Sequence, residues 1–318
     1  MSIRLGNTVI TQIGKIKAGS SNVKKVMAGS TQIWPVGILT WVNVPTGSSF
    51  DILGVDADQD TDIVLVGQNA ISRSFNSGSS WTGQAPGLNI YTDVIHFGTG
   101  YFYAPATSGN LFYTTTTTGS WTTATGSFGS LNGITYRVSS NGFYAVGDNG
   151  TIAVSDGLNS WGDYDRVNTS NDLHAISTEI IVCGNGGVIL NLYFDIDGPY
   201  WALESTPTSS NLFGIYSRTT GTIRHVAVGN NGTIITSGNG TSWTSRSSPT
   251  SENLRDVIYS DYHSLWLACG ENGTIIQSGD GINWSIEPSG VSDHLLSLAK
   301  FGNYILAAGA NGRLIKGI

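Results

Sequence analysis

Tryptophan recurs along this chain at a nearly constant interval. Seven of the nine tryptophans follow one another 40 to 42 residues apart, at Trp41, Trp81, Trp121, Trp161, Trp201, Trp243 and Trp284. A fixed period of this length is typical of proteins built from supersecondary repeats, in which each repeat buries its apolar faces against its neighbours. The spacing therefore predicts a repeat-built chain in which these seven tryptophans hold equivalent structural positions.

The segments between the tryptophans repeat one pattern. An apolar stripe such as residues 131–136 is followed by a short apolar run that ends in glycine, an Asn-Gly pair, a Thr-Ile strand and a second glycine-rich turn. Asn-Gly between two apolar runs is a strong hairpin signal, because both central residues of the tight turn need a positive φ. Each repeat therefore reads as four short antiparallel strands with the tryptophan on the fourth, which is the size of a β-propeller blade.

The ends of the chain predict how the ring closes. Residues 313–318 form the third strand of the seventh repeat, and its missing fourth strand is expected at residues 39–44, around Trp41. We therefore expect an all-β fold with almost no helix: a seven-bladed β-propeller over residues 37–318, whose last blade is closed by the N-terminal strand. Such closure leaves no open sheet edge.

Residues 1–36 differ from the repeats. They contain three Gly-polar-polar-x-apolar units, which predict a small N-terminal β arm of three short hairpins that needs a partner surface. The first fifty residues carry five basic residues and no acid, whereas the remainder carries ten basic residues against all 22 acids. The arm could dock on an acidic protein surface, or it could be a solvated basic tail.

Charge and hydropathy exclude two classes of partner. An acidic body repels the phosphates of nucleic acid, so we expect no nucleic-acid partner. No apolar run approaches the roughly eighteen residues that a membrane span needs, and the N-terminus lacks a secretory signal, so we expect no membrane insertion. Cys183 and Cys269 fall at equivalent strand positions two blades apart, too far for a disulfide, and are expected to be buried thiols.

A run of alternating carboxylates stands out in the first repeat, in the sequence Asp56-Ala-Asp58-Gln-Asp60-Thr-Asp62. Oxygen ligands at this spacing resemble the start of a calcium loop. Against calcium, Thr61 stands where the loop would need glycine and Gly67 where it would need glutamate, so a solvated acidic loop is the alternative. Calcium is the one cofactor for which the sequence offers a candidate site.

Motifs of catalysis are missing from the sequence. The five histidines fall in different repeats without ligand spacing, the nine arginines do not recur at one strand position, and no nucleophile elbow or phosphate loop is present. We therefore expect that the protein is not an enzyme and has no catalytic residues. A propeller glycosidase, the third alternative for its function, would need convergent carboxylates at the central channel, and the sequence does not reveal them.

The turn before several tryptophans resembles the Asp-box of sialidase-like propellers, with a pattern close to S-x-D-x-G-x-x-W. It occurs at residues 74–81, 155–161, 237–243 and 278–284, the first with the full spacing and the others shorter or degenerate. The resemblance implies a structural role for the box, whose Asp or Asn would satisfy turn N–H groups while the tryptophan packs between blades.

Two further resemblances suggest functions. The glycine-turn repeats of residues 1–36, which end in Trp34-Pro35, resemble N-terminal repeats of structural proteins of tailed bacteriophages. That resemblance implies a virion protein made in the host cytoplasm, a tail, fibre or capsid-decoration component that binds other virion proteins through residues 1–36 and displays the propeller to a host-surface glycan. The blades also resemble the seven-bladed propeller that assists photosystem II assembly, so a soluble assembly factor or lectin is the alternative. A homo-oligomer would be consistent with particle symmetry.

Overall fold

The computed structural model describes two compact units, Met1–Leu39 and Thr40–Ile318. In the first unit it describes residues 3–5, 8–10, 17–18, 21–22, 26–28, 31–34 and 39. In the second it describes all residues except 59–60, 85–86, 99, 116–119, 125, 139–141, 158, 164–166 and 168. The division lies three residues beyond the arm boundary expected at residue 36.

The first unit consists of three small antiparallel hairpins, as the repeated glycine units predicted. The three pairs of strands are β1 (Ile3–Leu5) with β2 (Thr8–Ile10), β3 (Lys17–Ala18) with β4 (Ser21–Asn22), and β5 (Val26–Ala28) with β6 (Thr31–Trp34). Each sheet has two strands only, a size that is marginally stable by itself in water.

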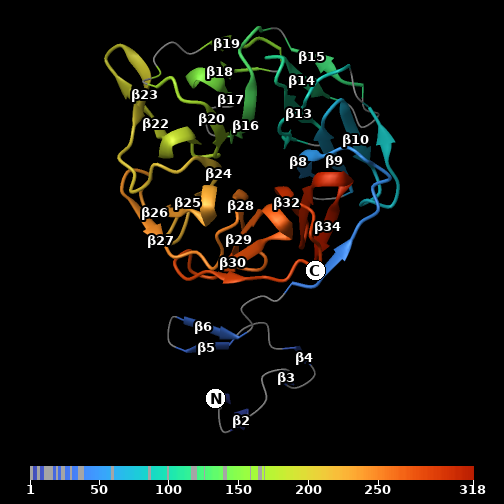
Figure 1. The fold of residues 1–318 in the computed structure, drawn as a ribbon, viewed down its shortest axis with the longest axis vertical. Helices are drawn as coiled ribbons and strands as arrows, with labels where there is room; N and C mark the ends of the chain where they lie inside the picture. Colours follow the sequence, from blue (N-terminus) through green and yellow to red (C-terminus); the bar gives the residue numbers. More distant parts are fainter. Residues whose placement is uncertain are drawn as a thin grey trace. The chain divides into compact units, whose positions relative to one another are not determined.

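The second unit is a seven-bladed β-propeller, and the predicted fold class is confirmed (Figure 1). Every blade is a four-stranded antiparallel sheet. Blade 1 contains β8 (Ile52–Ala57), β9 (Ile63–Gly67), β10 (Ala70–Ser74) and β11 (Thr82–Gly83). Blade 2 contains β12 (Ile95–His96), β13 (Phe102–Pro105), β14 (Leu111–Thr114) and β15 (Thr122–Thr123). Blade 3 contains β16 (Leu131–Arg137), β17 (Gly142–Gly147), β18 (Ile152–Ser155) and β19 (Gly162–Asp163).

The remaining blades follow the same order around the ring. Blade 4 contains β20 (Leu173–Ile176), β21 (Ile181–Gly184), β22 (Ile189–Asp195) and β23 (Gly198–Leu203). Blade 5 contains β24 (Leu212–Ser217), β25 (His225–Gly229), β26 (Ile234–Ser237) and β27 (Trp243–Arg246). Blade 6 contains β28 (Leu254–Ser260), β29 (Leu265–Gly270), β30 (Ile275–Ser278) and β31 (Ser285–Ile286). Blade 7 contains β32 (Leu295–Phe301), β33 (Tyr304–Gly309), β34 (Leu314–Gly317) and β7 (Trp41–Asn43).

The Asn-Gly pairs form tight turns between the second and third strands. In blade 3, Asn149 has φ of 55° and Gly150 has φ of 75°, and the Thr151 N–H donates to the Asp148 carbonyl at 3.1 Å. Both central residues are therefore left-handed, as the hairpin prediction requires. The described helices are short 3-10 turns at these positions, and none is long and apolar enough to cross a membrane.

The last blade is closed by the N-terminal strand, as predicted. β7 pairs antiparallel with β34, and Thr40 and Ile318 exchange two backbone hydrogen bonds of 3.2 and 3.1 Å. The Val44 N–H adds a third bond to the Leu314 carbonyl at 2.9 Å. The first and last strands of the ring thus lie in one sheet, and the propeller has no unpaired seam between its ends.

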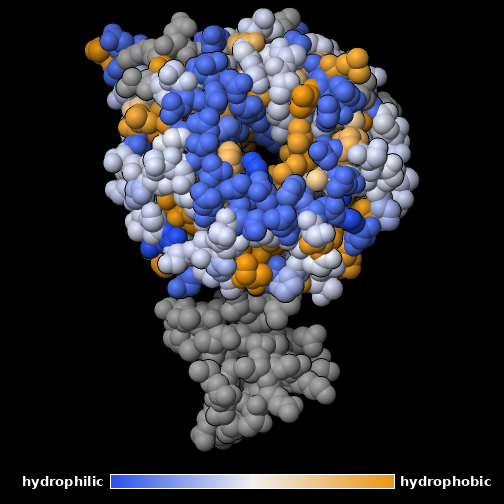
Figure 2. Space-filling view, in the orientation of Figure 1, coloured by the Kyte–Doolittle hydropathy of each residue, from blue (hydrophilic) through white to orange (hydrophobic). Residues whose placement is uncertain are grey.

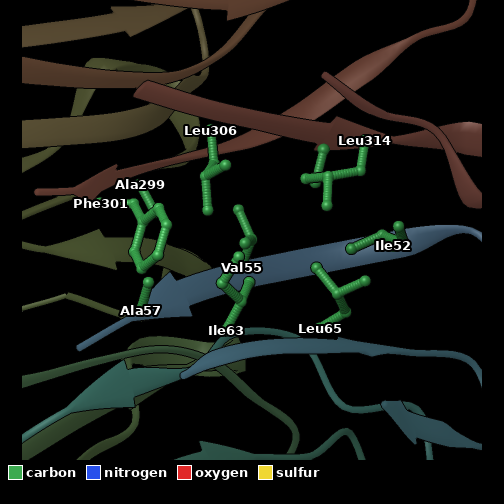
Figure 3. Packing of buried hydrophobic residues seen from close by; sticks show 10 residues of the cluster. Ile52, Val55, Ala57, Ile63, Leu65, Ala299, Phe301, Leu306 and Leu314 are labelled. Carbon is green, nitrogen blue, oxygen red and sulfur yellow. The ribbon is translucent and has the colours of Figure 1, made fainter. Parts of the chain in front are cut away.

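The core lies between neighbouring blades. At the junction of blades 7 and 1, Ile52 and Val55 from β8 and Leu65 from β9 meet Leu306 and Leu314 from β33 and β34 (Figure 3). All five are almost completely buried. Since complete burial of such a side chain contributes about 1.5–3 kcal/mol, these interfaces supply much of the stability of the ring.

The repeat tryptophans pack in the same interfaces. Six of them contact a hydrophobic cluster between two blades: Trp81, Trp121, Trp161, Trp201, Trp243 and Trp284. Trp41 opens β7 and is half-buried. The sequence predicted that each tryptophan lies within the fourth strand. Most of these tryptophans instead begin the fourth strand or directly precede it, because the preceding turn holds the ring between the blades. The exception is Trp201, in the middle of β23, where blade 4 has a longer hairpin.

Candidate binding site

The innermost strand of each blade lines the central channel, which is open on the face shown in Figure 2 and rimmed there mainly by hydrophilic residues. In six blades this strand has a bulge between its first and third residues, for example between Leu254 and Asp256. A bulge re-aims the side chains beside it. The third position therefore faces the next blade at the channel wall.

Carboxylates at this third position join neighbouring blades. Asp93, just before β12, accepts hydrogen bonds from the Val94 N–H at 2.8 Å and, in the next blade, from the Ile134 N–H at 3.1 Å. Asp256 does the same with the N–H groups of Val257 at 2.7 Å and Leu298 at 2.8 Å. The inner strand is a sheet edge with unpaired N–H groups, so these side chains replace a missing ladder partner.

Blades 7 and 1 form similar hydrogen bonds to the following blade, but with side chains at other positions or of another type. The Ser297 hydroxyl accepts a bond from the Val55 N–H at 3.2 Å. Asp56, two residues further along its own strand than the third position, accepts bonds from the N–H groups of Ala57 at 2.8 Å and His96 at 2.6 Å. Among the described contacts along the channel wall, three carboxylates and the Ser297 hydroxyl thus each accept an N–H group of the following blade.

Burial perturbs the channel carboxylates. It raises the pKa of Asp93 to about 8 and that of Asp256 to about 6. The negative charges of Asp256 and Asp56 raise the pKa of Asp93 further, whereas its two backbone N–H bonds lower it. Burial also raises the pKa of Asp56. Every oxygen of these three side chains accepts a backbone hydrogen bond, so the three carboxylates hold neighbouring blades together.

A cavity of about 440 Å³ lies at one mouth of the channel, at the ends of the innermost strands of blades 1, 2, 6 and 7. Its wall contains both signs of charge and an exposed aromatic side chain, contributed by Asp56, His96, Asp261, Tyr262 and Lys300. Tyr262 is 61% exposed, so most of its ring surface is available to a ligand. We call this group of five residues the channel-mouth site.

Lys300 is positioned by its neighbours. Its Nζ donates to the Tyr216 hydroxyl at 2.8 Å and lies 3.7 Å from the Asp261 carboxylate. Partial burial lowers the pKa of Lys300, but the contacts with Tyr216 and Asp261 raise it, and the net shift is upward. The ammonium group is therefore charged and held at the rim, where it can bind an acidic or carbonyl group of a ligand.

The predicted acidic run does not form a metal site in the described residues. The Asp58 carboxylate accepts bonds from the N–H groups of Thr61 and Asp62, both at 2.9 Å, and so closes the loop between β8 and β9. Asp62 forms an ion pair with the buried Arg73, and Asp56 faces the channel. Asp60 lies outside the described residues. Where side chains are described, no three metal-binding groups converge, so calcium stays an untested prediction with three of its four ligands engaged elsewhere.

The turns before the tryptophans are stabilised as expected in three blades. The Asp280 Oδ1 atom accepts bonds from the N–H groups of Ile282 and Asn283, both at 2.8 Å. Asn239 and Asn76 cap the corresponding turns of blades 5 and 1. In blade 3, Ser155 binds the turn carbonyl of Gly157 instead. These hydrogen bonds fix the turn in front of the tryptophan, which is a structural role.

The cysteines are buried free thiols, as predicted, and each is fully enclosed at the equivalent point of β21 or β29. The histidines lie in five different blades. His225 is the most buried of them, hydrogen-bonded to Ser217 at 2.9 Å, and burial lowers its pKa to about 4. Cys183, Cys269 and His225 are therefore enclosed in the core of the propeller.

Sequence reasoning missed the channel carboxylates although the repeat contained their signal. The third position of the inner strand is small in the other blades, at Gly54, Gly133, Ala175, Gly214 and Ser297. A Cβ atom at Gly54 would lie 2.8 Å from the Asp93 Cα atom, and one at Gly214 would lie 2.8 Å from the Asp256 Cα atom. An aspartate at a repeat position that holds a small residue in the other blades is therefore the signal by which the channel carboxylates could have been recognised.

No protein-family model and no curated protein matches the sequence. Solved structures share the fold. YCF48 bound to D1 peptide is 17% identical, with 89% of this chain and 97% of that chain covered and a TM-score of 0.69. An inactive virginiamycin B lyase from Staphylococcus aureus, solved with quinupristin, is 14% identical, with 87% and 98% covered and a TM-score of 0.74. The WD40 repeats of RRP9 are 14% identical, with 87% and 96% covered and a TM-score of 0.67.

Identities this low show the fold alone. The chain is a seven-bladed β-propeller whose fold resembles that of a lyase, of a peptide-bound protein and of a WD40-repeat protein. Its function must therefore be argued from its own residues.

Proposed function

We propose that this propeller is a non-catalytic binding scaffold of the assembly-factor kind, which holds an extended segment of a partner polypeptide at the channel-mouth site. The observation that carries the proposal is the cavity of about 440 Å³ with its exposed Tyr262 and its rim charges Lys300 and Asp261. Aromatic rings at the centre of a binding surface, flanked by charges, are typical of protein interaction sites.

Two further observations support a scaffold. The three channel carboxylates, Asp56, Asp93 and Asp256, each accept a backbone hydrogen bond from the next blade, which is a structural role. We therefore expect no turnover. A structure of similar fold, YCF48, was solved with a D1 peptide bound, so a propeller of this fold can hold a peptide.

The experiment is a selection of displayed random peptides on the immobilised full chain. The affinity of the enriched peptides is then measured for a Tyr262→Ala, Lys300→Ala double variant. The matched control is Ile286→Ala, which changes an exposed residue on the outer strand of blade 6. We expect the enriched peptides to bind the double variant at least tenfold more weakly than the unaltered chain and to bind the Ile286→Ala control with unchanged affinity. Equal binding to both variants, or no enrichment at all, would reject the channel-mouth site.

A second candidate is the virion structural protein, in which residues 1–36 dock on other particle proteins and the propeller is displayed. The acid-free basic sequence of the arm, and its folding into three separate hairpins, favour a docking element over a continuous tail. No similarity reported above bears on a particle. Immunogold microscopy of purified particles with antibody against residues 47–318 tests it, and unlabelled particles would end this proposal.

A further inference from the structure

Between blades 4 and 5, away from the channel, lies a second cavity of about 230 Å³. Its wall is mostly polar, and its side chains come from two blades: Glu179, Asn191 and Tyr193 from blade 4, and Arg224 and Asn239 from blade 5. The cavity is smaller than the roughly 300–1,000 Å³ that drug-sized ligands occupy, so it suits one small ring. We propose that this blade 4–5 cavity binds a single uncharged pyranose residue of a saccharide.

The long hairpin of blade 4 orients the aromatic wall. Tyr193 stacks with Tyr200 across β22 and β23, with ring centroids 5.8 Å apart and planes 27° apart. The Tyr193 hydroxyl donates to Glu204 at 2.7 Å. A ring held at both its face and its hydroxyl offers a rigid surface of low entropic cost, against which the C–H face of a pyranose can pack.

The amide groups are fixed in complementary orientations. Asn191 uses its Nδ2 atom to donate to Glu204 at 3.1 Å and to the Gly240 carbonyl at 2.8 Å. Its Oδ1 atom is left as an acceptor. Asn239 is bound in the opposite sense: its Oδ1 atom accepts the N–H groups of Thr241 at 3.1 Å and Ser242 at 2.9 Å, which leaves its Nδ2 atom as a donor. One amide thus offers an acceptor and the other offers a donor.

Two charged side chains complete the wall. Arg224 donates from Nε to the Gly238 carbonyl at 2.6 Å, and this bond anchors the guanidinium while its terminal nitrogens remain as donors. Glu179 is an exposed acceptor in the turn before β21. Sugar hydroxyls both donate and accept, so they match this alternation of donors and acceptors. Because Arg224 and Glu179 carry opposite charges, the wall favours a neutral ring over an anion or a cation.

The test uses saturation-transfer difference NMR on the full chain. The probes are the methyl glycosides of glucose, galactose, mannose, N-acetylglucosamine and N-acetylgalactosamine, with N-acetylneuraminic acid as the charged comparison. We expect at least one neutral glycoside to bind in the millimolar range usual for weak single-ring ligands. Glu179→Ala and Tyr193→Ala should each weaken it about tenfold or more, while Tyr193→Phe should retain part of the affinity because it keeps the ring.

Variants separate this inference from the scaffold proposal. Tyr262→Ala at the channel-mouth site should leave sugar binding unchanged, and Glu179→Ala should leave peptide binding unchanged. Glu179 has no hydrogen-bond partner among the described residues, so its removal should not unfold the blade, which thermal unfolding verifies. Binding of N-acetylneuraminic acid alone, binding unaffected by Glu179→Ala and Tyr193→Ala, or no signal from any glycoside would overturn the assignment.

Discussion

Deleting residues 1–46 removes β7 and should open the ring. Besides the ladder between β7 and β34, several hydrogen bonds join residues 40–46 to the rest of the propeller, among them these five: the two between Thr40 and Ile318, Val44 N–H to Leu314, Trp81 Nε1 to the Pro45 carbonyl, and the Thr46 hydroxyl to the Gly312 carbonyl. At about 1 kcal/mol each they contribute about 5 kcal/mol. That sum equals the lower end of the roughly 5–15 kcal/mol by which native proteins are stable.

Deletion of residues 1–36 is the matched control, because it removes the arm and leaves β7 in place. Tryptophan fluorescence in a urea titration should show an unchanged midpoint for this variant. The longer deletion should lower the midpoint strongly or abolish the cooperative transition. Thr46→Ala, which removes the buried bond to the Gly312 carbonyl and the bond accepted from the Ser48 N–H, should cost about 1–2 kcal/mol and lower Tm by about 2–8 °C. A 1–46 deletion that unfolds at the midpoint of the full chain would refute the closure argument.

Three other outcomes follow from the channel and the core. Asp93→Ala should destabilise the ring by about 1–3 kcal/mol in urea unfolding, since the Ile134 N–H loses its partner, whereas Asp93→Ser should cost less because the serine of blade 7 already accepts the same kind of bond. Folding raises the pKa of Asp93 to about 8 and that of Asp256 to about 6. Their protonation therefore contributes fully to the free energy of unfolding below the ordinary aspartate pKa near 3.8, and this contribution is lost as the pH rises through the pKa values of the folded protein. Tm should therefore fall toward pH 8, and less in Asp93→Ala. Burial raises the pKa of the Cys183 and Cys269 thiols, so Ellman's reagent should leave both unmodified in the native protein and titrate both in guanidinium.

The repeat architecture was predictable because its signals are local and recur. An Asn-Gly pair such as Asn149-Gly150 needs two positive φ angles wherever it occurs, so the hairpin follows from two residues. The spacing of the tryptophans then counts the blades. Closure by Trp41 follows from counting as well, since the seventh repeat lacks one strand and the N-terminal segment supplies it.

The candidate sites were not predictable in the same way. The channel-mouth site draws Asp56, His96, Tyr262 and Lys300 from four blades, and no spacing in the sequence shows that they meet. The blade 4–5 cavity depends on the longer hairpin that holds Tyr193, which breaks the repeat rather than follows it. The acidic run crosses the end of a strand: Asp56 lies in β8, whereas Asp58 and Asp62 lie in the connection to β9, so Asp56 and Asp62 bind different partners, and the calcium prediction stays untested.

The pairing of β7 with β34 also means that the last blade can form only late in synthesis. Thr46 and its partner Gly312 are 266 residues apart, so β7 leaves the ribosome long before β34 exists. At about 5–20 residues per second the wait is roughly 13–53 s. During that interval the six continuous blades can stack one on another while the first strand stays single. The circle is completed only after translation has passed Gly317, so a nascent chain that stalls late would keep an accessible strand as a handle for chaperones.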